Sequence, residues 1–173
     1  MTYFDLFDLQ PHLDIDLDEL KSKFLALQQK YHPDLNPEHV EEAIKQSSQV
    51  NQAYETLKHI DSRAAYLLKL NKQDHGLELS IHDFEFLQSA LELREHLDEA
   101  NSTEQLESLR DEVQQWITGL IREFQIDLED QDWAEARDTV RKLRFFRHVL
   151  IDIDKAEDSL FDDNHFDAFD DDF

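Results

Sequence analysis

The residues most capable of chemistry are His32, Pro33 and Asp34, which follow Tyr31 and lie between two stretches of helical pattern. An imidazole and a carboxylate this close together could act as an acid–base pair. Such a pair also needs a water-excluding pocket and a group that positions a substrate, and a surface turn supplies neither. Taken alone, these three residues are typical of a helix that ends before a proline and is followed by a turn at an aspartate. An exposed imidazole and carboxylate on a rigid loop would alternatively suit a docking surface with no catalytic residue.

The helix that precedes this loop is the part of the N-terminal half that has a basic side. Lys23 and Lys30 are seven residues apart and therefore lie on one flank of its apolar face, with Lys21 across from them. A basic flank beside the loop predicts a partner with an acidic surface.

Metal and cofactor chemistry finds little support in the composition. No two of the nine histidines have the H-x-x-x-H spacing that places two imidazoles on one helix face. The absence of cysteine excludes disulfides, thiolate zinc and iron–sulfur clusters bound by this chain. With only two glycines there is no glycine-rich loop for nucleotide phosphates. We expect neither a metal nor a cofactor.

The net charge of −24 makes nucleic acid and anionic lipid poor partners. No apolar stretch approaches the roughly 20 residues of a membrane span, and no signal peptide opens the sequence. These features predict a soluble, cytoplasmic protein that binds neither nucleic acid nor membrane.

The periodicity is helical almost throughout, and the scarcity of glycine and proline argues against a β-sandwich or barrel. Asp16 and Glu19 form a capping-box pattern for a first long helix that must end near His32. Asn36 and Pro37 predict the start of a second helix, antiparallel to the first. The expected apolar face of the first helix is Leu20, Phe24, Leu27 and Tyr31. The residues expected on or near the inner face of the second helix are Ile44, Asn51, Tyr54 and Leu57.

The polar stretch from Asn71 to Gly76 indicates a linker between two domains. Beyond it, Ser80, Asn101 or Ser102, and Asp130 are N-cap signals for three helices that would form a bundle. The expected division is 1–72, a linker at 73–79, a three-helix domain at 80–160 and an acidic tail at 161–173. We expect this tail to be disordered, and a binding arm is the alternative interpretation. The middle helix has an apolar stripe of Leu106, Leu109, Val113, Trp116, Leu120 and Phe124.

Helical angles separate two kinds of apolar residue in the bundle. Phe86, Ala90, Leu93 and Leu97 fall within one stripe, which predicts the core face of the helix after Ser80. In the last helix the corresponding cluster is Ala136, Leu143, Phe146 and Leu150, and Phe145 should point away from the interior. The residues that fall off the core stripe of the earlier helix are Leu87, Leu91, Glu92, Glu95 and Glu99. These residues would form either a binding patch or, more plainly, packing leucines beside a solvated acidic face.

Three segments in the N-terminal half resemble the J-domain family, the co-chaperones of DnaK-type ATPases. They are Tyr3-Phe4-Asp5-Leu6-Phe7, Tyr31-His32-Pro33-Asp34 and Asn51-Gln52-Ala53-Tyr54-Glu55-Thr56-Leu57. Three later segments resemble the HscB type, which serves iron–sulfur cluster assembly, so that the resemblance covers about residues 1–150. They are Arg63-Ala64-Ala65-Tyr66-Leu67-Leu68, Leu91-Glu92-Leu93-Arg94-Glu95 and Asp138-Thr139-Val140-Arg141-Lys142-Leu143-Arg144-Phe145.

The resemblance implies an all-α, L-shaped protein with a J-domain and a three-helix scaffold-binding domain. It implies a co-chaperone that stimulates the ATPase of a DnaK/HscA-type chaperone and delivers an iron–sulfur cluster scaffold of the IscU type to it. The residues it assigns to chaperone binding are Lys23, Lys30, Tyr31, His32, Pro33 and Asp34. Those it assigns to scaffold binding are Leu87, Leu91, Glu92, Glu95, Glu99 and Phe145.

Three positions depart from the family pattern. Leu35 replaces a usual basic residue, Asp8 replaces a common glycine, and Gln88 stands where an apolar residue is frequent. The first would weaken attraction at the loop, and the last would make the scaffold patch smaller. A general J-protein with another client is the alternative function.

Overall fold

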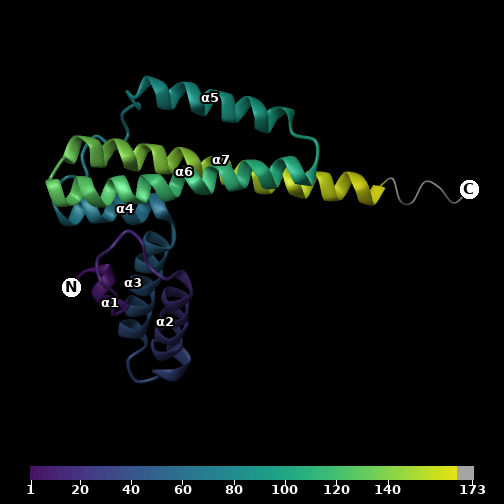
Figure 1. Ribbon diagram of the computed structural model, residues 1–173. Helices are drawn as coiled ribbons and strands as arrows, with labels where there is room; N and C mark the ends of the chain where they lie inside the picture. The colour runs from purple at the N-terminus through teal and green to yellow at the C-terminus, as the bar shows by residue number, and fades with distance from the viewer. Residues whose placement is uncertain (167–173) are drawn as a thin grey trace, which may run out of the picture. The chain divides into compact units, whose positions relative to one another are not determined.

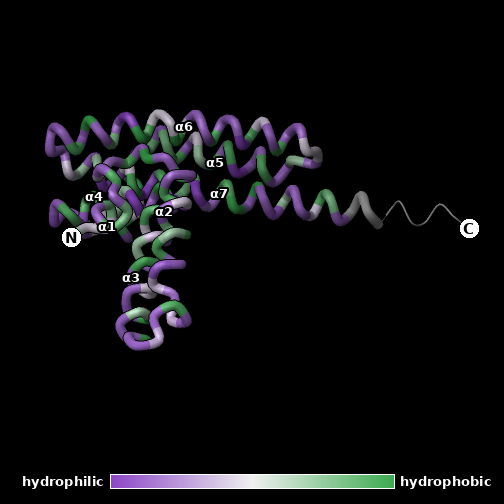
Figure 2. The backbone as a smooth tube through the Cα atoms, turned by 90° about the horizontal axis from the view of Figure 1, so that it is seen from below, coloured by the Kyte–Doolittle hydropathy of each residue, from purple (hydrophilic) through white to green (hydrophobic). Residues whose placement is uncertain are grey.

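The computed structural model describes the backbone of residues 1–166 and the side chains of residues 1–162, and this part of the chain is helical without strands. That confirms the all-α prediction. The chain forms two compact units, Met1–His75 and a second that begins at Gly76. Figure 1 shows the helices, and Figure 2 shows that apolar and polar residues alternate along each of them. The helices are α1 (Tyr3–Leu6), α2 (Leu17–Lys30), α3 (Val40–Lys58), α4 (Ile60–Leu70), α5 (Phe84–Glu99), α6 (Thr103–Asp130) and α7 (Trp133–Phe166).

Helices α2 and α3 form the predicted antiparallel hairpin of the first unit. The Asp16 carboxylate caps α2 by accepting hydrogen bonds from the amides of Asp18 and Glu19. Helix α2 ends at Lys30 with Tyr31 as its C-cap, as expected from Pro33 two residues after the cap. The predicted start of α3 is wrong by three residues. The helix begins at Val40, and the residue at its N-cap position, His39, makes no side-chain capping bond. Asn36 does not cap it, since the Asn36 amide is used inside the loop.

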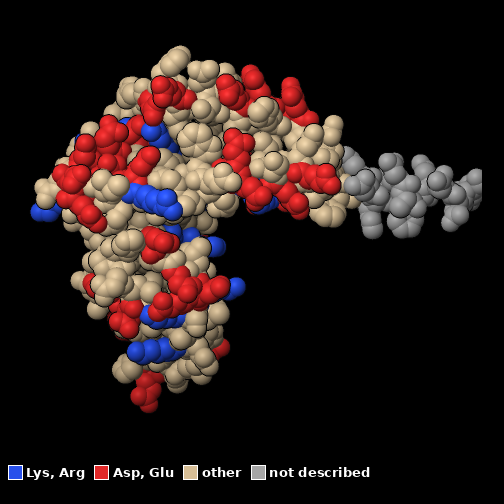
Figure 3. All heavy atoms as spheres, viewed as in Figure 1, with Lys and Arg blue, Asp and Glu red and all other residues tan. Residues whose placement is uncertain are grey.

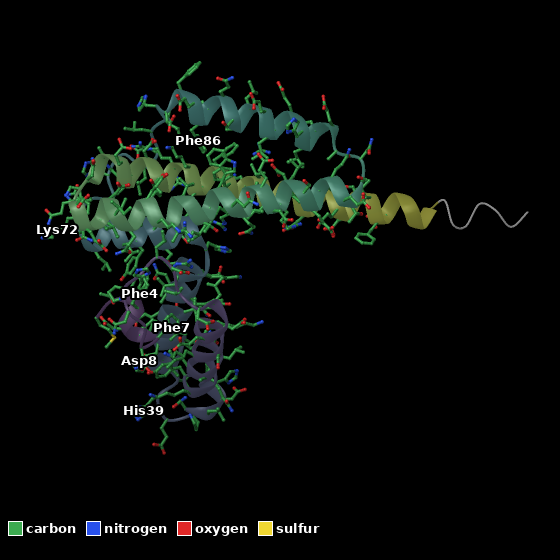
Figure 4. All side chains as sticks on the ribbon, in the orientation of Figure 1. Phe4, Phe7, Asp8, His39, Lys72 and Phe86 are labelled. Atoms are coloured by element: carbon green, nitrogen blue, oxygen red, sulfur yellow. The ribbon has the colours of Figure 1, made fainter. Side chains whose placement is uncertain are left out.

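The core of the first unit lies between α1, the α2–α3 hairpin and α4. Phe4 and Phe7 are completely covered there (Figure 4). On α3 the predicted inner face is largely wrong, because Ile44 and Asn51 are exposed and Tyr54 is half-buried. The fully buried positions are the smaller Ala43, Val50 and Ala53, together with the predicted Leu57. Small side chains at this seam let the two helices approach closely.

In the first unit, a buried arginine of α4 is hydrogen-bonded both to the segment before α2 and to the end of α3. Arg63 of α4 donates from Nε to the Leu13 carbonyl at 2.7 Å and from Nη1 to the Leu57 carbonyl at 2.5 Å. Burial lowers the pKa of its guanidinium to about 10, against the opposing charges of Asp14 and Asp61. The contacts fix the segment that leads into α2 relative to the end of α3, and so fix both legs of the hairpin.

Helices α5, α6 and α7 form the predicted three-helix bundle. Phe86, Ala90, Leu93 and Leu97 of α5 are buried, which confirms its expected core stripe. On α6 the stripe is confirmed except at Trp116, which is 40% exposed while Ile117 is buried in its place. On α7 the buried apolar positions are Ala136, Val140, Leu143, Phe146, Val149 and Ile153, whereas the expected Leu150 is half-buried.

The starts of the bundle helices agree with the sequence at one position out of three. Ser102 caps α6 as predicted, through its hydroxyl and the Gln105 amide. Helix α5 is capped by Asp83 and not by Ser80. Asp130 is the last residue of α6, and α7 begins at Trp133. Helix α7 continues to Phe166, so the first residues of the expected tail are helical, and 167–173 lie outside the described residues.

An ion pair between a buried lysine and an exposed carboxylate holds the start of α5 against α7. Lys142 Nζ lies 2.9 Å from Asp83 Oδ2 and 3.5 Å from Asp138 Oδ2. The hydrogen bond from Lys142 lowers the pKa of Asp83, and so does the bond from the Phe86 amide. Burial alone would lower the pKa of Lys142, but its bonds to the two carboxylates outweigh this and raise it. Both pKa shifts favour the charged forms of Asp83 and Lys142, so an ion pair fixes the start of α5 on α7.

Asp127 lies among other carboxylates beside the turn that joins α6 to α7. Gln131 makes this turn in the left-handed conformation, with φ of 59°. Partial burial raises the pKa of Asp127 to about 6, and the charges of Asp132, Glu135, Glu123 and Asp130 add to the effect. Below about pH 4 the Asp127 carboxyl is protonated in both the folded and the unfolded chain. As the pH rises from 4 through 6, the unfolded chain loses this proton more readily than the folded chain, so the folded state loses stability.

We predict that Asp127→Asn raises the thermal unfolding midpoint by about 2–4 °C at pH 7.5, because partial exposure limits the penalty to about 1 kcal/mol. The gain should vanish at pH 4, as measured by circular dichroism melts. Asp111→Asn, which removes an exposed carboxylate of α6, serves as the control and should change the midpoint much less. An equal gain at both pH values would contradict the assignment.

Candidate functional site

The loop between α2 and α3 presents an imidazole and a carboxylate on a closed turn. His32 is extended, and Pro33–Leu35 form a single 3₁₀ turn, η1. The Asn36 side-chain amide donates to the carbonyls of Lys30 and His32, each at 2.9 Å. These bonds join the end of the loop to its beginning, while the side chains of His32 and Asp34 stay 54% and 88% exposed. The polar groups are therefore both accessible and held in a defined place.

His32 and Asp34 also contact each other. The Asp34 amide donates to His32 Nδ1 at 3.2 Å, and Asp34 Oδ2 lies 3.6 Å from the same nitrogen. As an acceptor, Nδ1 carries no proton in the neutral ring, which places the proton on Nε2. The imidazole is thus oriented by its neighbour and keeps Nε2–H as a donor for another molecule.

The two lysines expected to flank the loop differ in their surroundings. Lys30 is exposed, and its ammonium lies 5.2 Å from the centre of the Tyr31 ring. Lys23 instead pairs with Glu19 at 2.6 Å and donates to the Asp8 carbonyl at 2.8 Å. Asp8, which replaces the common glycine, has φ of 49°, so Lys23 supports a left-handed turn. The charge beside the loop comes chiefly from Lys30.

The second candidate surface is the outward face of α5 in the other unit. Leu87 and Leu91 are 44% and 61% exposed, and Glu92, Glu95 and Glu99 are exposed beside them. Five of the six expected scaffold residues therefore lie together on one helix face. Figure 3 shows carboxylates over both units with basic groups as smaller patches between them.

The expectation that Phe145 points away from the bundle interior is wrong. Its ring is half-buried and packs edge-on against Phe86 and Phe146, with centroid distances of 5.7 and 5.4 Å. The Arg94 guanidinium lies over the ring at 5.5 Å. The helical angle shows only that Phe145 lies on a different side of α7 from its main buried residues. It does not show that α5 packs against that side as well. Phe145 joins α5 to α7 as well as lining the surface.

One exposed aromatic residue beside this surface did not enter the sequence prediction. Phe84 is 77% exposed and lies three residues before Leu87, about 60° away from it around α5. With Leu87 and Leu91 it makes an apolar ridge, which we call the α5 ridge. The signal that could have found Phe84 in the sequence is its spacing of three residues from Leu87.

Each of the two units matches a different protein-family model. The model of the DnaJ domain matches residues 2–66, and that of the HSCB C-terminal oligomerisation domain matches residues 82–154. The chain is 65% identical over 173 residues to a co-chaperone protein HscB homolog of Acinetobacter baumannii, covering all of both sequences. The chain belongs to the HscB family of co-chaperones. The resemblance found in the sequence is confirmed.

Solved structures of the HscB family have the same architecture. The chaperone HscB from Vibrio cholerae is 33% identical, with a TM-score of 0.76 over 92% of this chain and 99% of that chain. Human co-chaperone HscB is 29% identical, with a TM-score of 0.73 over 91% and 82%. The His32 loop falls in the J-domain match and the α5 ridge in the C-terminal match. Within residues 1–162, none of the helices has the length and apolar composition of a membrane-spanning segment.

The role of Asn36 in closing the loop can be tested directly. We predict that Asn36→Ala speeds amide exchange at Leu35 and Asn36 at least threefold, because their bonds to the His32 and Pro33 carbonyls lose support. Hydrogen-exchange NMR measures both positions. Gln46→Ala, which removes a side-chain bond to Glu42 on α3, is the control. Unchanged exchange at both loop amides would show that Asn36 does not close the turn.

Proposed function

We propose that this chain stimulates ATP hydrolysis by a DnaK/HscA-type chaperone and delivers an iron–sulfur cluster scaffold of the IscU type to it. The observation that carries the proposal is the exposed, locally fixed His32-Pro33-Asp34 loop in a J-domain whose own chain also carries an HscB-type bundle. In this mechanism the ATPase chemistry belongs to the partner. This chain contributes binding surfaces, and none of its residues is catalytic.

The loop would act as a rigid contact for the ATP-bound chaperone. His32 offers Nε2–H as a donor and Asp34 offers a charged acceptor, so each can bind a polar group of the opposite kind. Because Asn36 and the 3₁₀ turn already fix the loop, little conformational entropy is lost on binding. Lys30 adds a positive charge that favours approach to an acidic surface, and Tyr31 and Pro33 complete the expected contact.

The α5 ridge would bind the scaffold. Leu87 and Leu91 expose enough apolar surface that their burial could contribute about 1.5–3 kcal/mol each before ordering costs. Glu92, Glu95 and Glu99 border the ridge and favour a partner with basic groups around an apolar centre. Phe145 would support this surface by holding α5 in place.

For the chaperone contact, we predict that His32→Gln abolishes stimulation of the chaperone's ATPase, because glutamine cannot reproduce the ring geometry that Asp34 fixes. The measurement is the steady-state ATPase rate of the DnaK/HscA-type chaperone. Scaffold affinity and helicity should not change. His39→Gln is a matched control in the same hairpin, since the His39 side chain makes no capping bond. Full stimulation by the His32 variant would refute the chaperone contact.

For the scaffold contact, we predict that the double change Leu87→Ala and Leu91→Ala weakens scaffold binding at least tenfold, about 1.4 kcal/mol. Isothermal titration with an IscU-type scaffold measures it. Phe145 is left intact because its ring packs against Phe86 and Phe146. Ile126→Ala with Ile151→Ala removes two exposed aliphatic side chains of the same unit and is the control. Unchanged affinity of the ridge variant would favour a general J-protein with another client.

A further inference from the structure

A basic groove lies next to the α5 ridge in an otherwise acidic molecule. It has a volume of about 360 Å³ and is bounded by the segment before α5, by α5 itself and by α7. Three arginines and His148 line it, against the single carboxylate of Glu78. We call it the Arg144 groove. Its main apolar and basic lining residues are Leu79, Ile81, Arg94, Arg144, Phe145 and His148.

Among the groove's three arginines, Arg144 is the one that pairs with no carboxylate in the described part of the chain, so its charge can meet another molecule. Arg94 pairs with Asp152 at 2.5 Å, and Arg141 pairs with Asp138 at 3.1 Å. Arg144 Nη1 donates to the Leu77 carbonyl at 3.2 Å, a contact with a group that has no net charge. An arginine presents several donors in one plane, so this bond leaves others for a carboxylate.

The walls of the groove are already in place. Arg141 donates to the Gly76 carbonyl from Nε at 3.2 Å and from Nη2 at 2.7 Å, and thereby holds the segment before α5 on α7. Gly76 makes this turn with φ of 70°, and a side chain there would meet Leu79. The Phe145 ring is fixed by Phe86 and Phe146. A groove built in this way can bind without first being ordered.

The groove and the glutamates lie on opposite sides of the α5 ridge. With Leu87 at about 0° around the helix axis, Leu91 and Phe84 lie at about 40° and 60°. Arg94, at the edge of the groove, lies at about −20°, whereas the acidic stripe of Glu92, Glu95 and Glu99 lies between about 80° and 140°. Because Arg94 and Arg144 line the same groove, the apolar ridge has this basic groove on one side and the acidic stripe on the other.

We propose that the Arg144 groove takes a carboxylate-bearing apolar segment of the same scaffold that binds the α5 ridge. The proposal rests on the proposed function and adds to it that scaffold docking is polarised. The scaffold would present acidic groups to Arg144 and basic groups to the acidic stripe. A scaffold turned the other way would bring like charges together, so the two borders fix one orientation.

Two charge reversals test the polarity. Arg144→Glu takes the net charge from −24 to −26, and Glu92→Lys takes it to −22. We expect each to weaken scaffold binding about tenfold at 0.1 M salt, with a smaller loss at 0.5 M. An effect of net charge alone would instead weaken binding in one variant and strengthen it in the other. Arg122→Glu reverses an exposed arginine of α6 as the matched control, and its affinity should stay within twofold of the parent.

A second variant and the ridge variant separate the outcomes. Arg144→Gln removes the positive charge without placing a carboxylate beside the Leu77 carbonyl, so it should bind with about a threefold loss even if Arg144→Glu disturbs the groove wall. Parent-like affinity in both Arg144 variants, with weakened binding in the ridge variant, would overturn polarised docking but leave the proposed function. Parent-like affinity in the ridge variant would overturn both. A changed oligomeric state without a change in affinity would identify a second copy as the occupant and also overturn the proposal.

Discussion

The ion pair between Asp83 and Lys142 determines which face of α5 remains for a partner. It combines a helix cap with a contact to another helix, because the Asp83 carboxylate accepts both from the Phe86 amide and from Lys142. Phe86 then packs against Phe145 and Phe146, and Arg94 pairs with Asp152 further along α5. Phe86 lies on the inward side of α5, and Arg94 lies at the edge between that side and the uncovered face. The opposite face of α5, with Phe84, Leu87 and Leu91, stays uncovered.

The first unit reaches a fixed surface by another route. Arg63 satisfies two backbone carbonyls in the core and so fixes the legs of the hairpin. Asn36 does the same at the tip, where its amide joins both ends of the loop. Buried or half-buried donors thus hold an exposed His32 and Asp34 in position. Both surfaces combine a rigid support with accessible groups, as protein recognition at small surfaces requires.

Local periodicity predicted the fold and the core of α5, because burial on one helix face depends mainly on spacing. Contacts between distant segments account for the errors. Ser80, Asn36 and Asp130 are all good capping residues, but Lys142 selects Asp83, and Asn36 is used inside the loop. Phe145 appeared outward because its helical angle does not reveal that α5 covers it. The burial of Lys142 and the Arg144 groove likewise depend on pairing across helices and had no signal in spacing.

In the proposed function, one chain connects two proteins through separate surfaces. Sedimentation velocity of this chain with an IscU-type scaffold and a hydrolysis-deficient DnaK/HscA-type chaperone in ATP tests it directly. The account predicts one complex that contains all three proteins, with the scaffold affinity of this chain unchanged by the bound chaperone. Displacement of the scaffold as the chaperone binds would contradict it.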